Sequence, residues 1–229
     1  MLRSLFRRFC YTQNTIRYRV EWPRLRDAFE KIPRAGVLFD GGAGSGEFMR
    51  KALAGGYAEK GIALEFDEPT FQVMRGNLGR RPDATLIQGS LLEVPLPDHT
   101  ADVVMSTQVL EHIEDHQKAA SELIRVLKPG GHAIITVPHP PEPFPNDGHV
   151  REGYTEADLR ALFEPLGMTL LHTDYFLTRG TVNRFMKADK LPVHGAFVPV
   201  ALIDAETSLG PEDRRADLPF GILGLFKKA

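Results

Sequence analysis

The sequence predicts an α/β protein built on a doubly wound sheet, and three observations support this prediction. Short apolar runs alternate with segments of helical periodicity along most of the chain. The runs are nearly continuous in apolar character, as expected of parallel strands that are buried on both faces. A glycine-rich turn follows the first run and leads into a helical pattern. With 229 residues, the chain is long enough to bury such a sheet in one domain.

Seven apolar runs of four to nine residues are the candidate strands. They comprise residues 36–40, 61–66, 84–87, 101–106, 132–137, 168–176 and 220–226. Because most of these runs are separated by helical segments, we expect a parallel sheet with helices on both faces.

Proline, glycine and capping residues punctuate the predicted helices between these runs. Apolar residues at helical spacing begin at Phe48 and stop at a Gly-Gly pair. Pro69 opens a second helix, because Pro is favoured at the first helical position. A third helix is expected over residues 115–127. A fourth begins at Thr155, and Asp158 completes the pattern of a capping box.

The N-terminal part of the chain differs in charge from the rest. Residues 1–34 carry a net charge of +6, whereas residues 35–229 carry −8, so we expect a basic arm on an acidic main domain. Residues 1–9 show a basic amphipathic pattern that suits peripheral contact with an anionic membrane or packing across the mouth of the main domain. Residues 16–22 alternate apolar and charged side chains, which predicts an extended segment.

Cysteine usage and the leading arginines indicate a cytoplasmic protein. Cys10 is the only cysteine, so the chain has no internal disulfide and no Cys-based zinc site, and we expect no metal. Arg3 and Arg7 interrupt any signal-like apolar core. The apolar stretch 195–203 is far shorter than the roughly 20 residues that a membrane-spanning helix needs. This stretch lies within residues 177–218, which we interpret as a cap over an acceptor pocket or a contact in a homodimer.

A D-x-G-x-G-x-G run from Asp40 to Gly46 follows the first predicted strand. Ligands of such sheets bind at the carboxyl ends of the strands, where glycines leave the backbone bare. A phosphate-binding P-loop would need a lysine after its last glycine, and here Glu47 follows Gly46. A dinucleotide fingerprint starting at Gly42 would need glycine at position 47. Acids at both ends of the run instead favour a ligand that carries positive charge.

Glu65 lies nineteen residues beyond the last glycine of this run, at the end of the second predicted strand. A carboxylate at that place can accept hydrogen bonds from both hydroxyls of a ribose. The two features together favour an adenosine-containing cation as the ligand.

Three segments in order, VLFDGGAGSG at 37–46, GIALEFD at 61–67 and residues 102–138, closely resemble successive motifs of class I methyltransferases. These enzymes use S-adenosylmethionine, and the likeness is to the small-molecule, methyltransferase type 11 branch that includes ubiquinone-type O-methyltransferases. The resemblance is dense over 36–137 and looser over 149–176. It implies a Rossmann-like seven-stranded sheet, mostly parallel with an antiparallel last strand.

The resemblance assigns the glycine run to the cofactor S-adenosylmethionine. Asp40 would orient the loop and the amino-acid end of the cofactor. Gly42, Ala43, Gly44 and Gly46 would supply the backbone floor beneath it.

Further cofactor positions follow from the same resemblance. Glu65 would hold the ribose, Phe66 would flank the adenine, and Gln108 would line the methionine part. Ser90 and Leu91 stand where many relatives place an aspartate, so recognition of the adenine amino group there would rest on Ser90 or on backbone groups.

A methyl group on a sulfonium is already activated, so alignment of the acceptor can supply roughly 7–11 kcal/mol of the barrier. A base can add about 10²- to 10⁴-fold when the acceptor is a hydroxyl of high pKa. His112 is the first candidate base and His139 the second, although His112 could instead fix local backbone or line the cofactor pocket. His149 and Arg151 are interpreted as loop polar residues or substrate contacts, and Glu111 as structural.

The predicted function is therefore methylation of a small molecule, on oxygen or nitrogen rather than carbon. The apolar cap and the basic arm favour a hydrophobic or lipid-linked acceptor. Nucleic acid is not expected, because STQV at 106–109 replaces the D/N-P-P-Y/F tetrad of amino-group methyltransferases and the acidic body offers no basic groove. The alternative from another class is a non-catalytic scaffold or sensor that binds the cofactor. A nicotinamide-dependent oxidoreductase is disfavoured by the glycine spacing.

Overall fold

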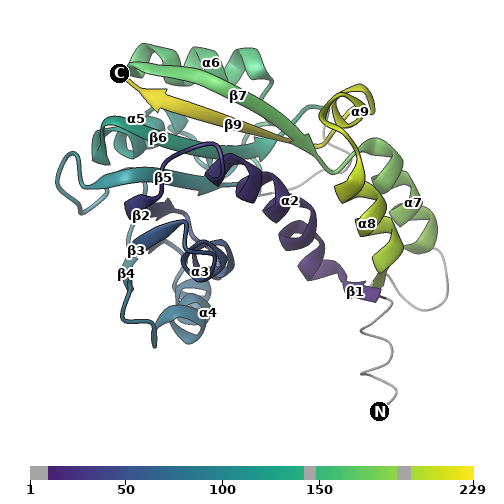
Figure 1. The fold of residues 1–229 in the computed structure, drawn as a ribbon, viewed down its shortest axis with the longest axis horizontal. Helices are drawn as coiled ribbons and strands as arrows, with labels where there is room; N and C mark the ends of the chain where they lie inside the picture. Colours follow the sequence, from purple (N-terminus) through teal and green to yellow (C-terminus); the bar gives the residue numbers. More distant parts are fainter. Residues whose placement is uncertain (1–9, 142–147, 190–196) are drawn as a thin grey trace.

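The computed structural model describes residues 10–141, 148–189 and 197–229, with side chains from residue 18 onward except those of 185–198. Its centre is a seven-stranded sheet in the order β4-β3-β2-β5-β6-β9-β7 (Figure 1). In chain order these strands are β2 (Ala35–Gly41), β3 (Ala58–Glu65), β4 (Ala84–Gln88), β5 (Ala101–Thr107), β6 (Leu127–Pro138), β7 (Met168–Phe176) and β9 (Gly221–Lys228). All seven predicted strands are confirmed.

The first five strands in sheet order, β4, β3, β2, β5 and β6, run parallel to one another. Strand β9 pairs antiparallel with both β6 and β7. This confirms the expected mostly parallel sheet with an antiparallel last strand. The strand order reverses direction between β2 and β5, which places the first strand-to-helix turn at the switch point where such sheets bind ligands.

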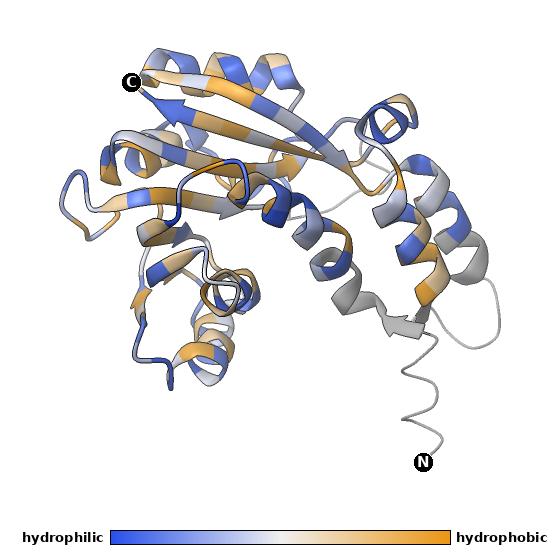
Figure 2. Ribbon diagram, viewed as in Figure 1, coloured by the Kyte–Doolittle hydropathy of each residue, from blue (hydrophilic) through white to orange (hydrophobic). Residues whose placement is uncertain are grey.

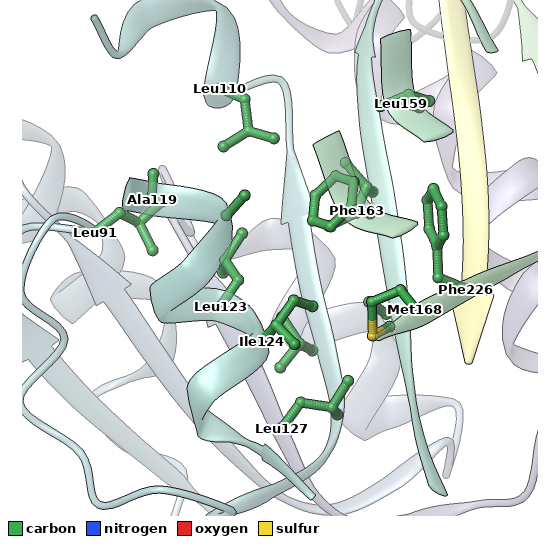
Figure 3. Packing of buried hydrophobic residues seen from close by; sticks show 14 of the residues in the cluster. Leu91, Leu110, Ala119, Leu123, Ile124, Leu127, Leu159, Phe163, Met168 and Phe226 are labelled. Atoms are coloured by element: carbon green, nitrogen blue, oxygen red, sulfur yellow. The ribbon is translucent and has the colours of Figure 1, made fainter. Parts of the chain in front are cut away.

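Helices cover both faces of the sheet (Figure 1). The helical elements are α2 (Gln13–Phe29), α3 (Glu47–Ala54), α4 (Glu68–Leu78), η1 (Leu110–His112), α5 (His116–Val126), α6 (Glu156–Phe163), η2 (Glu164–Leu166), α7 (Arg179–Asp189), α8 (Val200–Ser208) and α9 (Pro211–Ala216). One hydrophobic cluster joins the sheet to α2, α3 and α4. The other joins it to α5 and α6, with Leu123 and Phe163 among its buried residues (Figure 3).

Two of the predicted helices, α4 and α6, begin at residues that cap them with side-chain hydrogen bonds. The Asp67 carboxylate accepts a hydrogen bond from Thr70 N at the start of α4, where Pro69 occupies the first turn. Thr155 and Asp158 form the expected reciprocal capping box of α6. These bonds satisfy backbone donors that have no partner inside the helix, which explains why the helices begin there.

The prediction of an extended segment over residues 16–22 is wrong, because helix α2 includes these residues. Alternation over so few residues also fits a helix, and tertiary packing decides between them. The Trp22 ring stacks on Phe48 at 6.4 Å, and Leu25 and Phe29, three and seven positions further along, are buried in the core. The amphipathic pattern of residues 1–9 lies outside the described residues.

Helices α7, α8 and α9 lie between β7 and β9 in sequence and gather at one end of the sheet (Figure 1). A short strand β8 (Phe197–Pro199) pairs antiparallel with β1 (Cys10–Thr12). The Arg214 guanidinium of α9 donates three hydrogen bonds, of 2.7, 2.9 and 3.2 Å, to the Asp174 carboxylate of β7, and both side chains are buried. Arg24 of α2 approaches the same carboxylate at 3.8 Å, so one buried ion cluster joins the arm, the sheet and this helical segment.

The strands of the sheet are predominantly hydrophobic, whereas the helices mix hydrophobic and hydrophilic residues (Figure 2). This pattern matches a sheet that is covered on both faces. Within the described part of the chain, no helix combines the length and the apolar character needed to cross a membrane.

Candidate active site

A cavity of about 620 Å³ opens at the carboxyl ends of β2, β3, β4 and β5. Its volume lies in the range of small-molecule and cofactor sites. Eight of the sequence-predicted site residues line it, namely Gly42, Gly44, Glu65, Phe66, Ser90, Leu91, Gln108 and His112. The other four, Asp40, Ala43, Gly46 and His139, are not among its lining residues.

The glycine loop needs glycine at three positions because its backbone is left-handed there. Gly42, Gly44 and Gly46 have φ values of 79°, 57° and 74°. The carbonyl of Leu64 on the neighbouring strand accepts hydrogen bonds from both Gly42 N and Ala43 N, at 2.9 and 2.8 Å. The loop is therefore fastened to β3 at its base.

The three glycines differ in what a side chain would meet. A Cβ on Gly42 would lie 2.5 Å from Val109, and one on Gly46 would lie 2.5 Å from Leu78 of α4. A Cβ on Gly44 would meet nothing within 4 Å. Gly46 therefore allows close packing of the loop on α4, while Gly44 leaves bare backbone facing open space in the cavity wall.

The Glu65 carboxylate holds the glycine loop against the end of β3. Its Oε2 accepts a hydrogen bond from Gly44 N at 2.8 Å, and its Oε1 accepts from Phe66 N and Asp67 N at 2.9 and 3.0 Å. Two carboxylate oxygens offer about four acceptor positions, so these three bonds leave roughly one for a ligand. A ribose that donates from both hydroxyls would share an oxygen with the Gly44 amide.

Gln108 stands at the end of β5 in a strained conformation. Its φ is 54°, which is uncommon for a residue other than glycine, and its N donates to Thr136 O at 2.8 Å. Its side-chain Nε2 is buried and has no hydrogen-bond partner among the residues that the structure describes. A buried amide donor that lines a cavity needs an acceptor, which a ligand carboxylate can supply.

Apolar groups form another wall of the cavity. Phe66 is 73% exposed, and Leu91 and Leu92 come from the loop that follows β4. The Ser90 hydroxyl accepts a hydrogen bond from Leu92 N at 3.1 Å, so it shapes this loop while lining the cavity. An exposed aromatic ring opposite aliphatic side chains suits a flat heterocycle.

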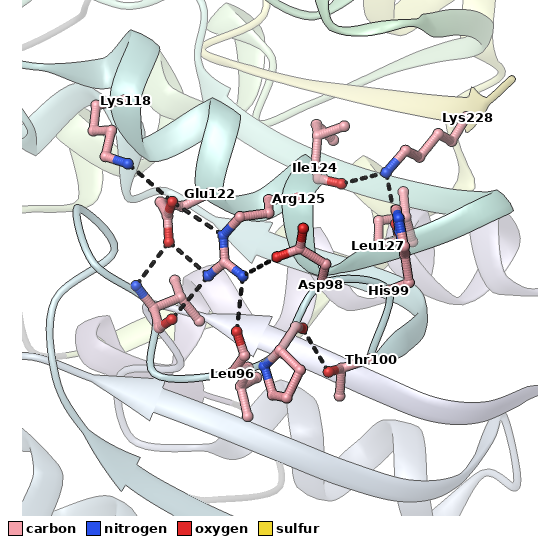
Figure 4. Close-up of polar contacts among 12 residues, drawn as sticks. Leu96, Asp98, His99, Thr100, Lys118, Glu122, Ile124, Arg125, Leu127 and Lys228 are labelled. Carbon is pink, nitrogen blue, oxygen red and sulfur yellow. Dashed lines mark hydrogen bonds and ion pairs between the residues drawn. The ribbon is translucent and has the colours of Figure 1, made fainter.

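The loop after β4 is held in place by Arg125 of α5 (Figure 4). Its guanidinium donates to the carbonyls of Val94 and Leu96 and to the Glu122 carboxylate at 2.9, 2.8 and 2.8 Å. Glu122 in turn accepts from Val94 N at 2.9 Å. These hydrogen bonds, with that of Arg125 first, lower the pKa of Glu122 to about 2.

Asp40 is buried at the end of β2, behind the glycine loop. The neighbouring Gly41 carbonyl accepts a hydrogen bond from the Ser106 hydroxyl of β5 at 2.8 Å. The two strand ends that flank the cavity are therefore joined, and Asp40 lies in the layer beneath the lining.

The two candidate bases occupy different places. His112 lines the cavity, and its Nδ1 lies 2.7 Å from the Gly148 carbonyl. His139 follows β6, and its ring lies edge-on to Tyr175 at 5.6 Å. Burial lowers the pKa of His139, which keeps its ring neutral near pH 7. The structure therefore brings only His112 of this pair to the cavity.

Sequence reasoning missed contacts that join distant segments. The Tyr18 hydroxyl of α2 lies 2.9 Å from the Ser45 hydroxyl in the glycine loop. Arg151 donates to the carbonyls of Leu110 and Ile113 at 2.6 and 2.8 Å, and so braces the turn that carries His112. No local pattern signals either contact, because both depend on elements that meet only in the folded chain.

Comparison with known proteins agrees with the methyltransferase resemblance of the sequence motifs. Residues 39–135 match the family model described as a methyltransferase domain. A relative from Mycolicibacterium smegmatis, named as a probable S-adenosylmethionine-dependent methyltransferase, is 36% identical over 137 residues, which are 57% of this chain and 52% of the relative. The demethylmenaquinone methyltransferase of Renibacterium salmoninarum is 32% identical over 145 residues, covering 62% of this chain and 56% of the relative. The chain spans about half the length of both relatives.

The fold also has solved counterparts. An S-adenosylmethionine-dependent methyltransferase of Mesorhizobium loti superposes with a TM-score of 0.65 at 19% identity, and the match covers 91% of this chain and 97% of that one. The cofactor expected from the motifs is the one in the names of these relatives. Residues 39–135 thus match a methyltransferase domain, and they lie in a sheet with the fold of that solved methyltransferase.

Proposed function

We propose that the chain is an S-adenosylmethionine-dependent methyltransferase that acts on a small molecule at oxygen or nitrogen. The observation that carries this proposal is the Glu65 carboxylate bonded to Gly44 N inside a cavity of about 620 Å³. A carboxylate locked beside bare glycine backbone suits a ribose. A pyrophosphate is opposed by Glu47, whose negative charge lies in the first turn of α3 where phosphates would bind.

The lining residues fit the three parts of the cofactor. Glu65 would accept from the ribose hydroxyls, and Phe66 with Leu91 would enclose the adenine. The buried Nε2 of Gln108 would donate to the carboxylate of the methionyl end. Asp40, Ala43 and Gly46 would act through the shape of the loop rather than by lining the cavity. The bound sulfonium supplies an activated methyl group.

The protein's part in the chemistry would be alignment and removal of a proton. Residues at the ends of β5 and β6 would hold the acceptor behind the methyl group, which is worth roughly 7–11 kcal/mol when geometry is good. His112 is the histidine that lines the cavity and would act on the acceptor. His139 lies away from the lining and would contact the acceptor only if the acceptor extends beyond β6.

We propose that residues 177–218 form a cap on the acceptor side. Helices α8 and α2 pack together there, and the buried Asp174–Arg214 pair fixes α9 to the sheet. An apolar cap and a basic arm favour a hydrophobic or lipid-linked acceptor.

Pelleting with anionic vesicles would support a peripheral membrane contact of residues 1–9. A sedimentation mass twice that of the chain would favour the dimer contact instead.

Nucleic acid is the less favoured acceptor. Residues 35–229 carry a net charge of −8, which opposes the phosphate contacts on which such binding depends. We propose a cytoplasmic location, because a chain with a single cysteine cannot form an internal disulfide and suits a reducing compartment.

Calorimetry and a transfer assay test this function in sequence. Titration of S-adenosylmethionine and S-adenosylhomocysteine should show one saturable site. Labelled methyl transferred to a metabolite in an extract would support the enzyme. Tight binding without any transfer would favour a scaffold or sensor, and absence of binding would refute the proposal.

A further inference from the structure

A second group of polar side chains lies beside the cofactor cavity. Glu111, His112 and His149 offer ligand atoms that all lie within 4.8 Å of one another. Glu111 is fully buried and His149 is half-buried, while His112 is exposed and lines the cavity. One carboxylate and two imidazoles form a donor set that binds divalent transition metals.

Two segments distant in sequence build this group, and backbone bonds join them. Val150 N donates to Glu111 O at 2.9 Å. Arg151 donates to the carbonyls of Leu110, Ile113 and Glu114, at 2.6, 2.8 and 3.0 Å. The segment that carries His149 is therefore fixed against the turn that carries Glu111 and His112.

The hydrogen bond of His112 selects its tautomer. Its Nδ1 lies 2.7 Å from the Gly148 carbonyl, which can only accept, so Nδ1 carries the proton. In the neutral ring, Nε2 then holds the lone pair, and it lies 3.9 Å from Glu111 Oε1. The His149 ring lies edge-on to His112, with centroids 4.7 Å apart at 78°. A backbone carbonyl that orients the far nitrogen is the usual support of a metal-binding histidine.

We propose that Glu111, His112 and His149 form a binding site for one divalent transition-metal ion at the edge of the cofactor cavity. Ligand atoms around a tetrahedral ion lie about 3.4 Å apart at metal–ligand distances of roughly 2.1 Å. The ligand atoms, which lie within 4.8 Å of one another, would have to approach further by side-chain rotation when the ion binds. The exposed His112 and half-buried His149 rings make that movement, because Glu111 is packed.

The site has a defined place in the reaction, and this role rests on the proposed transferase function. Three protein ligands leave a coordination position open. An acceptor hydroxyl bound there would have a lowered pKa and would lose its proton to solvent. The acceptor oxygen then forms a C–O bond to the methyl group as the S–C bond breaks, and that electron pair stays on sulfur. The inference narrows the acceptor to a hydroxyl compound and makes His112 a ligand rather than a base.

Calorimetric titration of Zn²⁺ into the full chain, after treatment with a chelator and without cofactor, tests the site. One equivalent should bind, and His149→Ala should weaken that binding at least 30-fold. Glu111→Gln should do the same, with circular dichroism to show that it folds. His99→Asn is the matched control, because it removes an exposed histidine elsewhere and asparagine tolerates the φ of 57° at that position.

The outcomes separate this inference from the proposed function. If the wild-type chain binds no Zn²⁺, or if His149→Ala binds it as tightly as His99→Asn does, the metal site is wrong. Binding of S-adenosylhomocysteine is measured on the same variants and should change by less than twofold in His149→Ala. Failure of that ligand to bind any variant would refute the transferase proposal, while the Zn²⁺ titration would still decide the metal site.

Discussion

Replacement of Glu65 by glutamine tests the centre of the proposed cofactor site. The carboxylate accepts from Gly44 N, Phe66 N and Asp67 N through its two oxygens. A glutamine keeps the size but turns one oxygen into an NH₂ group, so a donor faces a donor in either orientation. Loss of one charge-assisted hydrogen bond costs about 1.5–3 kcal/mol. A ribose contact of that strength corresponds to roughly 10- to 150-fold weaker cofactor binding.

Calorimetry with S-adenosylhomocysteine measures this loss, and thermal unfolding shows whether the loop or the whole fold has changed. Glu59→Gln is the matched control, because Glu59 lies on the same strand as Glu65 and its side chain is 62% exposed. The control should bind like the wild-type chain. A dissociation constant of Glu65→Gln within threefold of the control would show that the ribose lies elsewhere.

Three further predictions concern the loop, the neighbouring helix and the arm. Gly44→Val should abolish calorimetric binding of S-adenosylhomocysteine, because a branched side chain at φ 57° is strained and projects into open space. The pKa of Glu122 is about 2 in the folded chain, against an ordinary value of 4.5. Its ionised form therefore adds up to about 3 kcal/mol to the free energy of unfolding above pH 4.5, and this contribution is lost as the pH falls toward 2. Denaturant unfolding should show Glu122→Gln losing this part of the acid dependence. Deletion of residues 1–34 should abolish cooperative thermal unfolding, since it removes helix α2 from the core.

Much of the fold could be predicted because local signals agree with the tertiary structure. The strands are short apolar runs that are buried on both faces, and Pro69 and the Thr155–Asp158 capping box mark helix starts in the sequence itself. Helix α2 could not be predicted by alternation, because its Trp22 and Leu25 acquire a buried face only when α3 and the sheet pack against it. Tertiary contact overrides a short local pattern there.

The candidate site was predictable where function depends on backbone position. Strand ends and glycines are visible in sequence, so Glu65 and Gly44 could be placed together before the structure was known. The contact of His149 with His112 was not predictable, because the two residues lie 37 positions apart and their segments are joined by tertiary hydrogen bonds such as those of Val150 and Arg151. The different fates of His112 and His139 also depend on side-chain direction, which one-dimensional spacing does not encode.

The loops around the proposed cofactor cavity are all held in place in the same way. A charged side chain fixes each loop to backbone groups, as Glu65 does for the glycine loop, Arg125 for the loop after β4, and Arg151 for the turn after β5. Each of these side chains bonds to the protein's own backbone, so we expect ligand binding to require little further ordering of the loops. Substitution of such an anchor should therefore weaken affinity by more than its direct contact is worth, because the loop must then be ordered by the ligand itself. On the proposed acceptor side, residues at the ends of β5 and β6 and the proposed cap of residues 177–218 would contact the acceptor, and we expect acceptor specificity to depend on those segments.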